Sequence, residues 1–141
     1  MLADFISHIA SHAGVTTIQA RAALGIVLNA ADRQGAECAR EIFERVPGAR
    51  TLAARMGAET GAATGVIARL IEQTPGGRAE VAASLIRALH DQGLGHAEVA
   101  AVFPAISSFA ESEFGVRGLG HLGDVLGAGP APVSESGVSV V

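Results

Sequence analysis

The stretch TTIQARAALGIVLNAADRQG (residues 16–35) carries the local signals of a helix with a defined start and end. Thr16 is followed three residues later by Gln19, which fits a capping box in which each side chain bonds the backbone N–H of the other. Apolar residues then recur at helical spacing until Gly35 breaks the pattern. The predicted core stripe of this helix, which runs to about Gln34, consists of Ala20, Ala23, Leu24, Val27, Leu28 and Ala31.

Helical periodicity continues on both sides of this stretch. Residues 2–13 place an apolar stripe on one helical face, and Gly14 ends that helix. Shorter helical patterns are found at 36–46, from Pro47 to Gly57, at 66–73, 78–92 and 97–103, and after Pro104. The apolar content is mostly Ala, Leu, Val and Ile, with no Trp or Tyr, which suits closely packed helices. The sequence predicts an all-α fold, a compact bundle of six to eight short helices.

The domain organisation is expected to be one helical domain, residues 1–128, followed by a flexible Pro/Ser/Gly-rich tail, residues 129–141. EIFERVPGARTLA (41–53) and EVAAVFPAISSFA (98–110) both place a proline between two helical runs. If the halves 1–57 and 65–127 are pseudo-repeats, each proline forms the corner between two helices. Chance similarity between alanine-rich helices is the alternative. The glycines at 57, 61 and 65 favour a flexible connection between the halves.

Charge and composition exclude several classes of function. The formal net charge is −4, every basic residue is Arg, and acidic residues are interleaved with the arginines. A basic stripe for nucleic acid is therefore absent, as is any lysine chemistry. No apolar run approaches the length of a membrane span, so no membrane span is predicted. Cys38 is the single cysteine, which favours a reducing compartment, and the expected location is cytoplasmic.

Asp4, His8 and His12 recur every four residues and therefore share one side of the first predicted helix. Two imidazoles at this spacing can share a zinc ion. The Glu of an H-E-x-x-H motif is missing, and no further ligands are nearby. We interpret the three residues as a polar helix face and predict no metal and no cofactor.

Candidates for nucleophilic catalysis are few. Cys38 lies in an amphipathic helix, where a lone cysteine is usually a packing residue, and Ser107 and Ser108 lack a strand–elbow–helix setting. Three histidines could gather in space with neighbouring carboxylates. These residues are His90, His96 and His121, with Asp91 and Asp124. The alternative is that the histidines are exposed or cap helices. Because no catalytic constellation is visible, the chain is predicted not to be an enzyme.

Small and apolar residues over about residues 5–127 match the pattern of a known protein family. The matching positions are Gly14, Val15, Ala20, Pro47, Gly48, Gly93, Leu94, Phe103, Pro104 and Gly115. In this pattern the chain resembles the VcgC/VcgE-like proteins, small bacterial proteins of unknown function. It departs from the pattern between Gly57 and Gly65 and in its tail. The resemblance implies a helical fold and supplies no activity.

The sequence therefore favours a non-enzymatic helical interaction protein, which either self-associates or binds a protein partner. The predicted interaction face consists of Leu2, Phe5, Ile6 and Ile9, with Leu119, Leu122 and Leu126 next. The alternative function is a small module that binds an apolar ligand. Its pocket would be formed by Phe43, Phe103, Phe109 and Phe114.

Overall fold

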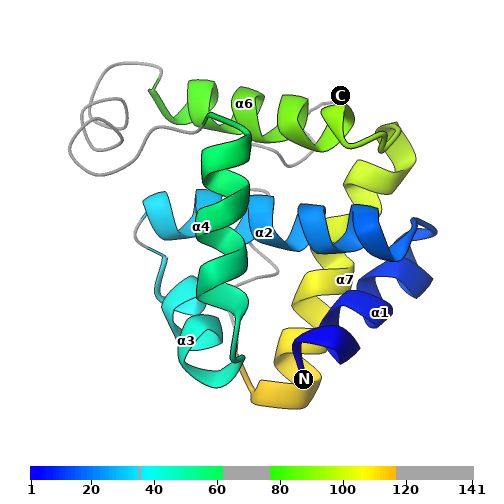
Figure 1. The fold of residues 1–141 in the computed structure, drawn as a ribbon, viewed down its shortest axis with the longest axis vertical. Helices are drawn as coiled ribbons and strands as arrows, with labels where there is room; N and C mark the ends of the chain where they lie inside the picture. Colours follow the sequence, from blue (N-terminus) through cyan, green and yellow to red (C-terminus); the bar gives the residue numbers. More distant parts are fainter. Residues whose placement is uncertain (35, 62–76, 117–141) are drawn as a thin grey trace, which may run out of the picture.

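A computed structural model describes residues 1–34, 36–61 and 77–116, and the regular structure in these residues is α-helical (Figure 1). The helices are α1 (Leu2–Ala13), α2 (Thr17–Arg33), α3 (Glu37–Arg45), α4 (Ala49–Glu59), α6 (Gly77–Asp91) and α7 (His96–Phe114). The predicted all-α fold is therefore confirmed. The predicted helix over 66–73, the stripe of Leu119, Leu122 and Leu126, and the tail 129–141 lie outside the described residues. No helix in the described ranges has the length and apolar content needed to cross a membrane.

Helix α2 lies at the centre of the fold and contacts each of the other five helices that the structure describes. In Figure 1 it runs across the middle of the molecule, α4 crosses it, and α1 and α7 lie together on one side. Every residue from Ala22 to Ala31 is buried, including those outside the predicted stripe. The stripe prediction is thus correct but too narrow, because a helix that is apolar on all sides is buried on all sides.

The N-terminus of α2 is fixed by the predicted capping box. The Gln19 backbone N–H donates to Thr16 Oγ1 at 3.0 Å, and the Thr16 N–H donates to Gln19 Oε1 at 3.0 Å. Gln19 Nε2 also donates to the carbonyl of Gln92 at 3.2 Å, in the turn that joins α6 to α7. One side chain therefore closes the start of α2 and ties it to a turn 73 residues away in sequence.

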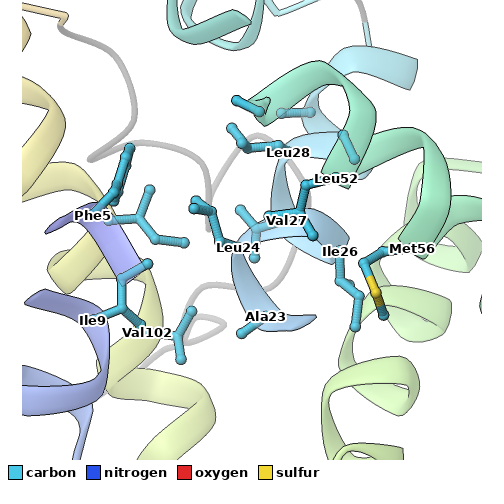
Figure 2. Packing of buried hydrophobic residues seen from close by; sticks show 14 of the residues in the cluster. Phe5, Ile9, Ala23, Leu24, Ile26, Val27, Leu28, Leu52, Met56 and Val102 are labelled. Carbon is cyan, nitrogen blue, oxygen red and sulfur yellow. The ribbon is translucent and has the colours of Figure 1, made fainter. Parts of the chain in front are cut away.

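Helices α2 and α4 approach closely at two glycines. A Cβ atom on Gly25 would lie 2.5 Å from Met56 Cγ and 3.1 Å from the carbonyl oxygen of Leu52. A Cβ atom on Gly57 would lie 2.6 Å from Asn29 Oδ1. Figure 2 shows Leu52 and Met56 lying over α2 at this crossing. A side chain at Gly25 would press on Met56 and on the α4 backbone at Leu52, and one at Gly57 would overlap the Asn29 side chain, so glycine permits the close packing at both positions.

The prediction that Gly57 ends a helix and begins a flexible connection is wrong. Gly57 is buried inside α4, which continues to Glu59. The glycine is used for close packing against Asn29 of α2, and the contact with α2 outweighs the low helix propensity of glycine. Gly61 adopts a left-handed backbone conformation with φ of 70°, and Gly65 lies outside the described residues.

The two prolines have different roles. Pro47 lies between α3 and α4, where Val46 is extended and Gly48 has φ of 90°, so the predicted corner is confirmed. Pro104 lies inside the continuous helix α7, and the predicted corner there is wrong. Proline removes the hydrogen bond to the carbonyl of Ala100, but both residues are exposed, and water can satisfy that carbonyl. Buried residues on either side, among them Val102 and Ile106, keep α7 packed as one helix.

Replacing Gly25 with alanine is expected to lower the free energy of unfolding by about 1–3 kcal/mol, because the added methyl group overpacks the α2–α4 crossing. At an uncrowded helical position the same change would raise stability by about 1 kcal/mol. The sign of the change therefore shows whether the α2–α4 crossing is crowded at Gly25. Urea denaturation of both chains measures the difference. Arg55→Ala, at an exposed position of α4, is the matched control and should change stability by less than about 0.5 kcal/mol. A Gly25→Ala chain more stable than the original would contradict the close approach.

Candidate functional site

The apolar face predicted on α1 is buried within the chain's own fold. Phe5 and Ile9 are fully buried, Ile6 is 5% exposed and Leu2 is half-buried. In Figure 2, Phe5 and Ile9 lie beside Val102 of α7 and face α2. Phe5 and Ile9 are therefore out of a partner's reach while α1 stays packed.

An aromatic cluster joins α1 to α7. The ring of Phe5 lies 4.7 Å from that of Phe109 and 6.2 Å from that of Phe114, and the last two rings are 5.8 Å apart, edge to face. Such pairs stabilise a contact beyond the area they bury. Of the four phenylalanines predicted to form a pocket, only Phe109 and Phe114 are brought together by these contacts.

The other two predicted pocket residues have separate environments. Phe43 is buried on α3, and the guanidinium carbon of Arg50 lies 4.7 Å from the centre of its ring. This distance is typical of a cation–π contact between α3 and α4. Phe103 is partly buried on α7 and packs against the core.

The polar side of α1 carries His8 and His12 with their rings stacked at 3.9 Å. His12 Nδ1 lies 3.0 Å from the carbonyl oxygen of His8, so this nitrogen is the donor. Asp4 instead lies 3.7 Å from the N-terminal amine. The three residues singled out in the sequence therefore do not converge. Across residues 1–34, 36–61 and 77–116, no three or more His, Cys, Asp or Glu residues are grouped to hold a metal ion.

His8 forms a polar tie between α1 and α7. Its Nε2 lies 3.0 Å from Ser108 Oγ, and its ring lies 5.1 Å from that of Phe109. Burial lowers the pKa of His8 below its ordinary value of 6.5, the charge of His12 lowers it further, and Glu113 acts in the opposite direction. The neutral imidazole is therefore the form that the α1–α7 contact favours.

A hydroxyl beside an imidazole is also the pair from which nucleophilic catalysts are built. Ser108 lies within α7, however, and its Oγ is 3.2 Å from the carbonyl of Ala105, the contact that a helical serine makes with its own backbone. Cys38 is buried, and burial raises the pKa of its thiol, which keeps it protonated and unreactive. We interpret Ser108 as a packing contact and Cys38 as a core residue.

Two hollows border α1. The larger, about 440 Å³, adjoins the aromatic cluster and is lined by Met1, Asp4, Phe109, Glu113 and Phe114. The smaller, about 260 Å³, lies between α1 and the start of α2 and is lined by Ala3, Ile6, Ser7, Thr17, Ile18 and Arg21. Ile18, at the rim of the smaller hollow, is 79% exposed. The candidate site is this surface around the N-terminal half of α1.

Sequence reasoning missed Ile18 and the His8–Ser108 contact. Ile18 lies in the first turn of α2, outside the predicted apolar stripe. A large apolar residue outside the stripe was the sequence signal that could have indicated an exposed contact residue. His8 and Ser108 are 100 residues apart, and neither has a local pattern that points to the other. Two of the other histidines do meet, since the rings of His90 and His96 are 5.8 Å apart. His121 and Asp124 lie outside the described residues.

Comparison with protein-family models, with curated proteins and with solved structures finds no match to this chain. The resemblance to the VcgC/VcgE-like proteins therefore remains a prediction from the sequence. The candidate site has to be interpreted from its own geometry.

Stability is expected to fall as pH is lowered below about 6.5, because the unfolded chain binds a proton at His8 more readily than the folded chain does. The loss continues down to the lowered pKa of the folded state and then levels off. Denaturant unfolding at several values between about pH 7.5 and pH 5.5 measures this slope. His8→Gln, which can still bond Ser108, should flatten it. Equal slopes in the two chains would contradict the assigned role of His8.

Proposed function

We propose that the chain is a non-enzymatic helical interaction protein whose contact surface lies where α1 meets the start of α2. The observation that carries this proposal is the exposure of Ile18, which leaves 79% of a large apolar side chain in water. Burying such a side chain against a partner would be worth about 1.5–3 kcal/mol. The surface replaces the buried α1 face as the candidate for contact.

The adjacent hollow indicates what kind of partner would fit. It offers apolar lining from Ala3 and Ile6 directly beside the projecting Ile18. A surface with a projecting side chain and a recess next to each other can be self-complementary, which is what a twofold interface between identical chains requires. Arg21 at the rim supplies a charge that would orient such a contact. We therefore favour self-association through this surface. Binding of a different protein to the same surface is the alternative.

The expected location of this protein is the cytoplasm. Its single cysteine is buried and held as a thiol, which suits a reducing compartment. With a formal net charge of −4 and arginines interleaved with acids, the partner is expected to be protein and not nucleic acid.

Native mass spectrometry of the untagged chain over a range of concentrations tests the proposal. The original chain should give a species of twice the chain mass, and Ile18→Glu should abolish it, because the interface would have to bury an unpaired carboxylate. Ala54→Glu adds the same charge at an exposed position of α4 and should leave the dimer intact. A bare monomer at every concentration would contradict self-association.

One further outcome would support the alternative function. A single chain that retains a small adduct would favour a ligand-binding module, for which the hollow of about 440 Å³ beside Phe109 and Phe114 is the candidate pocket. Its volume lies within the range of small-molecule sites. Because Asp4 and Glu113 also line it, a ligand with an apolar body and a positive charge would fit best.

A further inference from the structure

We draw no further inference here: the strongest candidate, the hollow beside α1 and α7 that is lined by Met1, Asp4, Phe109, Glu113 and Phe114, belongs to the candidate site already described and carries nothing beyond the ligand-binding alternative.

Discussion

Burial of α2 on all sides is the constraint on which the rest of the packing depends. A helix surrounded in this way needs neighbours on every face, and small side chains allow those neighbours to come close. At Gly25 the chain has no side chain at all, and the Met56 side chain of α4 fills the space that a Cβ atom would take. On another side, α1 and α7 both contact α2, and the stacked rings of Phe5 and Phe109 join α1 to α7. Gln19 then links the start of α2 to the α6–α7 turn.

Much of the helical framework could be predicted because its signals are local. The box formed by Thr16 and Gln19, the left-handed Gly14 and the corner at Pro47 all act within a few residues, and each occurs where the sequence indicates. The roles of Gly57 and Pro104 were predicted wrongly because contacts with distant residues decide them. Both break helices on local propensity, but the contact with Asn29 in one case and the packing of α7 in the other outweighs that propensity. Periodicity also could not reveal that α2 is buried on all sides, because it detects a helix with one apolar face and one polar face.

The candidate site was less accessible to sequence reasoning. Sequence patterns identified histidines, phenylalanines and serines of suitable chemistry, but distances between helices decide which of them meet. His8 reaches Ser108 and not a metal shared with Asp4, and Phe109 meets Phe5 and not Phe43. The apolar face of α1 was predicted to meet a partner, but Phe5, Ile6 and Ile9 are buried by the chain itself. An amphipathic stripe has the same appearance in a monomer and in an interface, so Ile18 could be distinguished only once the rest of the core was in place.

Native-state hydrogen exchange would test the central position of α2 most directly. If α2 is the helix around which the others pack, its amides between residues 24 and 31 can open only when the whole domain unfolds. These amides should therefore exchange most slowly, with an opening free energy equal to that of global unfolding measured by denaturant. If they exchanged through a smaller opening while the amides of α1 or α7 stayed protected, α2 would not be the centre of the fold.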